Sequence, residues 1–144
     1  MTVATILKNK RPGVETISPD QSVLVCAGQL AAGRIGALIV SADGSSLDGI
    51  ISERDIAYAL AVHGERLLDL PVSELMTKSV VICAPEDSIE KIMNIMTSRR
   101  IRHLPVKQGN RLIGIISIGD VLKHRVSELQ IEAGVLRDVS IVRR

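Results

Sequence analysis

The chain contains an internal repeat, which constrains its fold more than any other feature of the sequence. Residues 18–23 (SPDQSV) resemble residues 84–89 (APEDSI) at an offset of 66 positions. After a turn that is one residue shorter in the second copy, residues 49–56 (GIISERDI) match residues 114–121 (GIISIGDV) at an offset of 65. Ordered matches of this length indicate two copies of one structural unit.

Each copy is expected to follow the order β-α-β-β-α. The first helix of each copy is expected to start at Ser18, with Pro19 at its first helical position, and at Pro85. Two apolar strands joined by turn residues then predict a hairpin, and a second helix is expected from Ser52 and from Ser117. The apolar stripes of the first helices have helical spacing. They consist of Val23, Cys26, Ala27 and Leu30 in copy one, and of Ile89, Ile92, Met93 and Met96 in copy two.

The fold class expected from this pattern is α/β, of the α+β type, with two tandem units. A copy of about 60 residues buries too little apolar surface to be stable alone, so the two should pack sheet against sheet as one pseudo-twofold module. The expected parts are residues 1–64 and 72–127 for the two copies, 65–71 for a linker, and 128–144 for a helix extension and tail. Each copy opens with a lead segment, residues 3–7 in the first and 72–76 in the second.

Composition narrows the function classes. Hydrophobic residues make up 46% of the chain, but Tyr58 is its one aromatic residue, so the core must be aliphatic. A net charge of +2 without stacking aromatics argues against nucleic-acid binding. No apolar stretch approaches the roughly 20 residues that cross a bilayer, so we expect a cytoplasmic protein without membrane contact. Cys26 and Cys83 lie in apolar periodic segments and are interpreted as small buried hydrophobic residues.

The repeated motif Gly-Ile-Ile-Ser-x-x-Asp carries the chemistry that the sequence can offer. It places Ser52 and Asp55 in copy one, and Ser117 and Asp120 in copy two, at the start of a helix. Unpaired N–H groups and the helix dipole make such a start suitable for an anion. The same Ser-x-x-Asp pattern also describes a simple helix cap, and this structural interpretation stays open.

These residues give the chain a family resemblance. Residues 101–106 (IRHLPV), followed by residues 114–121, resemble the CBS domain, and the two copies resemble a CBS pair, or Bateman module, of the short stand-alone kind found in bacteria. The resemblance implies a regulatory module that binds adenosine-containing ligands between the two motifs. AMP, ADP or ATP are the first choice, with NADH and S-adenosylmethionine behind them. No cofactor and no metal are required.

The resemblance also implies roles for particular residues. Asp120 and Asp55 would hold ribose hydroxyls, and Arg102 and His103 would hold phosphate, as their counterparts look to do in the γ subunit of AMP-activated protein kinase. Copy one has Gly36 and Ala37 at the positions of Arg102 and His103, so the two sites are expected to be unequal. Arg54 is interpreted either as a second phosphate contact or as a solvent-facing side chain. The remaining predicted ligand-binding residues surround the base and its slot: Thr16, Ile17, Ile35, Val80, Val81, Ile82, Ile101 and Pro105.

Partners are harder to predict. Leu122, Val126, Leu129, Ala133 and Leu136 recur at 4-3-4-3 spacing and leave an apolar seam on the last helix. Either a second subunit, giving a homodimer, or the same chain packing back would cover this seam. The regulated protein is not identifiable.

An enzyme is not expected, because the three His residues are widely separated and no nucleophile or metal-binding motif occurs. The alternative function is a structural or protein-interaction module without a ligand. Residues 142–144 are expected to form a polar end.

Overall fold

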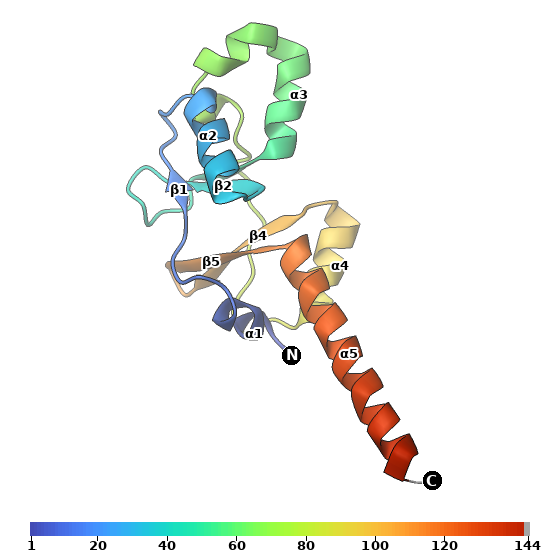
Figure 1. The fold of residues 1–144 in the computed structure, drawn as a ribbon. Coiled ribbons are helices and arrows are strands. Elements are labelled where there is room, and N and C mark those ends of the chain that lie inside the picture. The colour runs from blue at the N-terminus through green and yellow to red at the C-terminus, as the bar shows by residue number, and fades with distance from the viewer. Residues whose placement is uncertain (143–144) are drawn as a thin grey trace.

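The computed structural model describes residues 1–142, and it describes the surroundings of side chains up to residue 135. The fold is of the α+β type, with two copies of a small unit (Figure 1). The first copy runs through helix α1 (Val3–Lys8), strand β1 (Thr16–Ile17), helix α2 (Val23–Gly33), strands β2 (Ala37–Val40) and β3 (Gly49–Ser52), and helix α3 (Glu53–His63). Two 3-10 helices, η1 (Gly64–Asp69) and η2 (Val72–Glu74), lead into the second copy. It contains helix α4 (Ile89–Arg99), strands β4 (His103–Gln108) and β5 (Arg111–Ser117), and helix α5 (Ile118–Val142).

Both predicted hairpins are present. In the first copy, β2 pairs antiparallel with β3 and parallel with β1, which gives a three-stranded sheet. In the second copy, β4 and β5 form an antiparallel pair with a register shift between Val106 and Lys107. The first strand predicted for this copy is reduced to one bridge, Cys83 to Val106. Pro105 lacks the N–H that a longer parallel ladder would need, which accounts for the difference from copy one.

The first helix of each copy begins four residues later than the sequence predicted. Helix α2 is capped by Ser22, whose Oγ accepts the N–H of Val25 at 3.2 Å. Helix α4 is capped in the same way by Ser88, which accepts the N–H of Lys91 at 3.1 Å. The predicted starts at Ser18 and Pro85 are therefore wrong, because the residues after them form a turn before the helix begins.

Most of the predicted helix stripes are buried in the expected manner. Val23, Cys26 and Leu30 of α2 face the interior, as do Ile89, Ile92 and Met96 of α4. Two stripe residues differ: Ala27 is only partly buried, and Met93 is 37% exposed. Burial, reinforced by nearby Asp55 and Asp87, raises the pKa of Cys26 to about 11 and that of Cys83 to about 12. Both thiols are buried and free, so their interpretation as small hydrophobic residues is confirmed.

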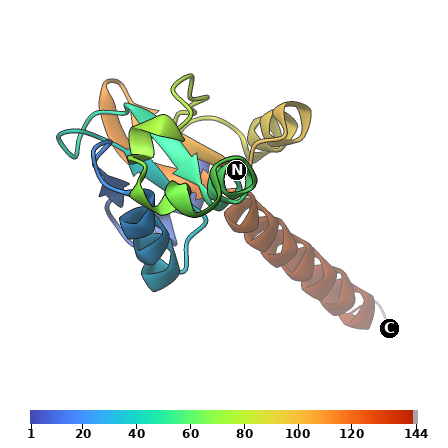
Figure 2. The same ribbon diagram turned by 90° about the horizontal axis from the view of Figure 1, so that it is seen from above.

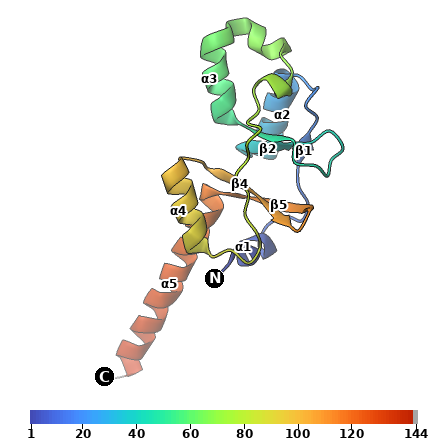
Figure 3. The ribbon, with the colours of Figure 1, turned by 180° about the vertical axis from the view of Figure 1, so that it is seen from behind.

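Each copy completes its core with the lead segment of the other copy. Val3 and Ile6 of α1 lie in the core of the second copy, which we call the second core, together with Ile92, Leu104 and Ile116. Val72 lies in the first core, with Leu38 and Ile51. Figures 1 and 3 show α1 beside β5, at the end of the molecule that the second copy forms. In space, the copies are therefore interleaved at their lead segments.

Helix α5 extends well beyond the body of the molecule, as Figures 1 and 2 show. Leu122, Val126 and Leu129 of the predicted seam are about half exposed, so the chain does not cover them, although Val121 at the start of α5 is buried in the second core. The side chain of Leu136 and the polar end predicted at residues 142–144 lie outside the described side chains. In the described part of the chain, no helix combines the length and apolar character needed to span a membrane.

Candidate functional site

Both repeated motifs form a reciprocal cap at the start of a helix. The main-chain N–H of Ser52 donates to Asp55 Oδ2 at 2.8 Å, and the N–H of Asp55 donates back to Ser52 Oγ at 3.3 Å. In the second motif, the N–H of Ser117 donates to Asp120 Oδ2 at 2.9 Å, and the N–H of Asp120 donates to Ser117 Oγ at 3.1 Å. The capping interpretation is therefore correct for both motifs. A binding role requires, in addition, that the carboxylate face a cavity.

Asp55 meets that requirement. A cavity of about 200 Å³, which we call the inter-copy cavity, has Asp55 in its wall and lies between the two copies. From the first copy its wall contains Ile50, Ser52, Glu53, Arg54 and Asp55. From the second copy it contains Thr77, Ser79, Val80, Val81, Arg100, Ile101, Arg102 and His103. The structure thus brings the first motif to the cationic and apolar residues predicted in the second copy.

The charges in this wall are unevenly divided. Three guanidinium groups, those of Arg54, Arg100 and Arg102, line the cavity against two carboxylates, Glu53 and Asp55. Val80, Val81 and Ile101 supply an apolar part of the wall. Guanidinium groups bind phosphate in a two-pronged geometry, and a carboxylate accepts hydrogen bonds from hydroxyl groups. The cavity can therefore hold a ligand with an anionic end, a hydroxylated middle and an apolar, flat end.

His103 reaches close to the backbone of the first copy. A Cβ atom at Gly36 would lie 3.1 Å from His103 Nε2 and 3.4 Å from Glu53 Oε1, so a glycine at this position leaves space for both side chains. Burial of His103 lowers its pKa, and this effect outweighs the nearby carboxylates of Glu53 and Asp120, which raise it. The imidazole is therefore mainly neutral at pH 7.

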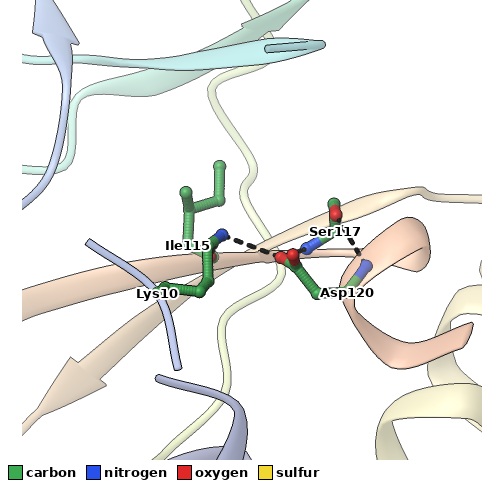
Figure 4. A network of polar contacts seen from close by, with 4 residues as sticks. All are labelled: Lys10, Ile115, Ser117 and Asp120. Carbon is green, nitrogen blue, oxygen red and sulfur yellow. Dashed lines mark hydrogen bonds and ion pairs between the residues drawn. The ribbon is translucent and has the colours of Figure 1, made fainter. Parts of the chain in front are cut away.

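Asp120 is in a different situation, because a lysine from the first copy reaches it (Figure 4). Lys10 Nζ donates to Asp120 Oδ2 at 2.7 Å and to the carbonyl oxygen of Ile115 at 2.7 Å. Burial raises the pKa of Asp120, but the hydrogen bonds from Lys10 and Ser117 outweigh it and leave the pKa below its usual value. Of the three cavities described, none has Ser117 or Asp120 in its wall.

The other predicted residues lie outside the inter-copy cavity. Ile35 and Gly36 line a separate groove between α2 and α3. Ala37 and Pro105 are buried in strands β2 and β4, and Ile17 is buried in the first core. Thr16 accepts a hydrogen bond from Gln29 through its carbonyl oxygen, and Ile82 is 45% exposed.

Six residues near the two motifs were missed by the sequence reasoning. Ile50, Glu53, Thr77, Ser79 and Arg100 line the inter-copy cavity, and Lys10 contacts Asp120. A signal for Lys10 exists in the repeat. The lead segments align at an offset of 69 (Val3 with Val72), whereas Ser18 aligns with Ala84 at 66, so the loop after the first lead segment is three residues longer. Glu53 stands inside the motif, where the second copy has Ile118, and no signal marked it.

Comparison with known proteins identifies the repeat. A sequence model described as the CBS domain matches residues 5–62 and residues 72–127. The chain is 34% identical over 114 residues to the CBS domain-containing protein YhcV of Bacillus subtilis, covering 79% of this chain and 80% of the relative. It is 31% identical over 135 residues to the mitochondrial CBS domain-containing protein CBSX3 of Arabidopsis thaliana, covering 88% of this chain and 66% of that protein.

Solved structures agree with these matches. A CBS-domain containing protein from Agrobacterium tumefaciens superposes with a TM-score of 0.83 at 45% identity, covering 87% of this chain and 99% of that one. A hexameric CBS-CP12 protein from bloom-forming cyanobacteria superposes with a TM-score of 0.73 at 31% identity, covering 85% and 70%. Proteins with a pair of CBS domains are regulatory or ligand-binding modules, and relatives consisting of CBS domains alone are typically not enzymes. Because the family match includes both repeats, this chain belongs to the CBS domain family and carries two CBS domains in tandem.

Proposed function

We propose that this chain is a regulatory sensor that binds an adenine nucleotide in the inter-copy cavity. The observation that carries the proposal is that Asp55 from one copy and Arg102 and His103 from the other line one cavity. Asp55 Oδ2 accepts hydrogen bonds from both the N–H and the Oγ of Ser52, and this arrangement fixes the carboxylate. The ribose hydroxyls would bind Asp55, the phosphate would bind the arginines, and the base would pack on Val80, Val81 and Ile101.

The cavity favours some adenosine compounds over others. Its three guanidinium groups suit the phosphates of AMP, ADP and ATP, and they repel the positively charged sulfonium of S-adenosylmethionine. A volume of about 200 Å³ is small for a ligand pocket, which disfavours a dinucleotide such as NADH. We therefore place AMP, ADP and ATP first. Occupancy would couple the two copies, because the ligand contacts both, and a partner would respond to the resulting change.

The test is a thermal-shift panel with AMP, ADP, ATP, NADH and S-adenosylmethionine, followed by calorimetric titration of the ligands that respond. At 100-fold excess over its dissociation constant, a ligand adds about 2.7 kcal/mol to the free energy of unfolding. Asp55→Ala should weaken the affinity about ten-fold or more, because hydrogen bonds to a charged group contribute roughly 1.5–3 kcal/mol. No response of the parent chain to any of the five compounds would refute the proposal.

Two further variants make the result specific. Asp87→Ala removes another carboxylate that accepts a main-chain N–H, that of Ala84 at 2.8 Å, but Asp87 is not in the cavity wall. This control should leave the affinity unchanged. Arg102→Met should weaken AMP binding and leave adenosine binding nearly unchanged, because adenosine has no phosphate. Equal losses for both ligands would contradict the assigned role of Arg102.

We also propose that the chain forms a homodimer through helix α5. Leu122, Val126 and Leu129 lie on one face of this helix and are each about half exposed. A row of exposed apolar side chains favours a protein–protein contact, and symmetric pairing is the commonest assembly. Analytical ultracentrifugation should give a dimer for the parent and a smaller species for Leu129→Glu. A monomeric parent at micromolar concentration would contradict this arrangement.

A further inference from the structure

The two motifs differ most in what lies in front of their carboxylates. Asp55 faces the inter-copy cavity, and its Oδ2 is held only by Ser52 of its own motif. Asp120 Oδ2 accepts the N–H of Ser117 and, in addition, the ammonium of Lys10. Each Oδ2 accepts two hydrogen bonds, but both bonds at Asp55 come from Ser52, whereas one of the bonds at Asp120 comes from a charged side chain of the other copy. The second Asp has therefore acquired a partner that the first does not have.

The ammonium of Lys10 occupies the position beside the Asp120 carboxylate. Its ammonium makes two hydrogen bonds of 2.7 Å, one to a carboxylate and one to the carbonyl oxygen of Ile115 on strand β5. Its side chain is 32% exposed, and that of Asp120 is 23% exposed, so the pair is partly shielded from solvent. A ribose hydroxyl that approached this carboxylate from the side of Lys10 would meet the ammonium, which already lies at hydrogen-bonding distance from Oδ2.

The origin of Lys10 explains why only one motif is affected. Lys10 lies in the loop between α1 and β1, which is three residues longer than its counterpart between the second lead segment and Ala84. At the first motif, the counterpart loop lines the cavity with Thr77 and Ser79, and its Lys78 is exposed and has no ion pair to Asp55 among the described contacts. The extra residues thus allow a long cationic side chain to cross from the first copy to the second motif.

The second site has fewer cations than the first, because Arg34, the repeat equivalent of Arg100, is the arginine that remains beside Gly36. Gly36 and Ala37 stand where Arg102 and His103 stand at the other site, so strand β2 supplies no phosphate contact. The ammonium of Lys10 is already paired with Asp120 and is therefore not free to bind a ligand phosphate. We propose, building on the nucleotide-binding function above, that Lys10 is an internal occupant of the second motif and that this chain therefore binds one adenine nucleotide, at Asp55, and not two.

The test is the number of adenosine molecules bound per chain, measured by equilibrium dialysis on the full-length parent and on Lys10→Met. Adenosine is the probe because it contains the ribose that Asp120 would hold. It has no phosphate, which the second site would leave without a cationic partner. Lys10→Met keeps the aliphatic stem and removes the ammonium, and it should bind one more adenosine per chain than the parent. Adding Asp120→Ala to this variant should remove the extra molecule. Lys8→Met, an exposed residue of the same segment, is the matched control and should bind as the parent does.

The outcomes separate this inference from the function on which it rests. If the parent binds AMP and Lys10→Met gains no adenosine while its circular dichroism melt shows it folded, Lys10 is not an occupant and the nucleotide function stands. A parent chain that already binds two adenosines overturns the inference in the same way. If neither AMP nor adenosine binds to either chain, both the inference and the nucleotide function are wrong.

Discussion

His103 is the residue whose protonation the site controls most directly. Burial lowers its pKa, the carboxylates of Glu53 and Asp120 raise it, and the cations Lys10 and Arg102 lower it. In the ligand-free chain the imidazole is therefore mainly neutral at pH 7. A phosphate bound beside it would add negative charge and raise its pKa, so that binding takes up a proton.

The first prediction concerns this proton. The affinity for AMP should increase as the pH falls from 8 to 6, and His103→Gln should flatten this dependence. The phosphate of AMP titrates near pH 6 in both proteins, so the difference between parent and variant isolates the histidine. Isothermal titration calorimetry at three pH values measures the difference. Identical pH profiles would exclude contact between His103 and the phosphate.

Stability without ligand should change in the opposite direction. Because the pKa of His103 is lower in the folded chain than its unfolded value of about 6.5, the unfolded state holds more protons on this residue near pH 6. The contribution of neutral His103 is present above about pH 6.5 and is lost as the pH falls toward the lowered pKa. Urea unfolding of the parent should therefore lose more stability than His103→Gln between pH 7 and pH 5.5.

At the residue scale, the sequence predicted the main residues of the site at Asp55, but it did not predict the lysine that contacts Asp120. The repeat and the family resemblance together pointed to Asp55, Arg102 and His103, and the structure places all three in one cavity. They also pointed to Asp120, because Asp120 and Asp55 occupy the same position in the repeat and were therefore expected to have the same role. Of these two carboxylates, Lys10 contacts only that of Asp120, and it comes from a loop that is three residues longer than its counterpart, so the matched residues of the repeat did not reveal it.

At the scale of elements, the helix starts show where local patterns are insufficient. The sequence predicted helix starts at Ser18 and Pro85, but the helices are capped by later serines, Ser22 and Ser88. The deciding contacts are distant in sequence: the N–H of Val23 donates to Leu70 O at 2.9 Å, and that of Ile89 to Met1 O at 3.2 Å. Both carbonyl groups come from the chain just before the lead segment of the other copy. Local capping rules contain no information about this contact.

A prediction at this scale uses two equivalent glycines of the motif strands. A Cβ at Gly49 would lie 2.8 Å from the carbonyl oxygen of Thr77, which also accepts the N–H of Ile50 at 3.0 Å. A Cβ at Gly114 would lie 2.8 Å from Leu7 Cδ2, the end of a flexible side chain. Gly49→Ala should therefore lower the free energy of unfolding by roughly 1–3 kcal/mol, and Gly114→Ala by less.

Urea denaturation of the two variants compares these costs in one host protein. Because Gly49 and Gly114 occupy the same repeat position, intrinsic propensity changes cancel and the difference reports the neighbouring atoms. A larger loss for Gly114→Ala would mean that the lead segment of the second copy is not held against β3 as the pairing of Ile50 with Thr77 indicates.

At the scale of the whole molecule, the sequence predicted two tandem units but not how they exchange segments. The boundaries drawn at residues 1–64 and 72–127 follow the chain, and both lead segments are assigned to the copy that follows them. In the structure, Ile6 is 4% exposed within the second core and Val72 is fully buried in the first. A repeat identifies which segments are equivalent, and it does not identify the copy against which each one packs.

This interleaving leads to the last prediction, that the chain unfolds in one transition. Ile6→Ala should cost about 2–5 kcal/mol, and Val72→Ala about 2 kcal/mol, because each leaves a cavity in a core. Ile6 belongs to the first copy in sequence and to the second core in space. Because each core contains a segment of the other copy, Ile6→Ala should speed hydrogen exchange in β4 as well as in β2. Leu68→Ala, at a residue that is 46% exposed, serves as the control and should change little. Two resolved calorimetric transitions would mean that the two copies fold independently, and so would an unchanged rate of hydrogen exchange in β2 of Ile6→Ala. In that case, a ligand at Asp55 could order both copies only through its own contacts across the cavity.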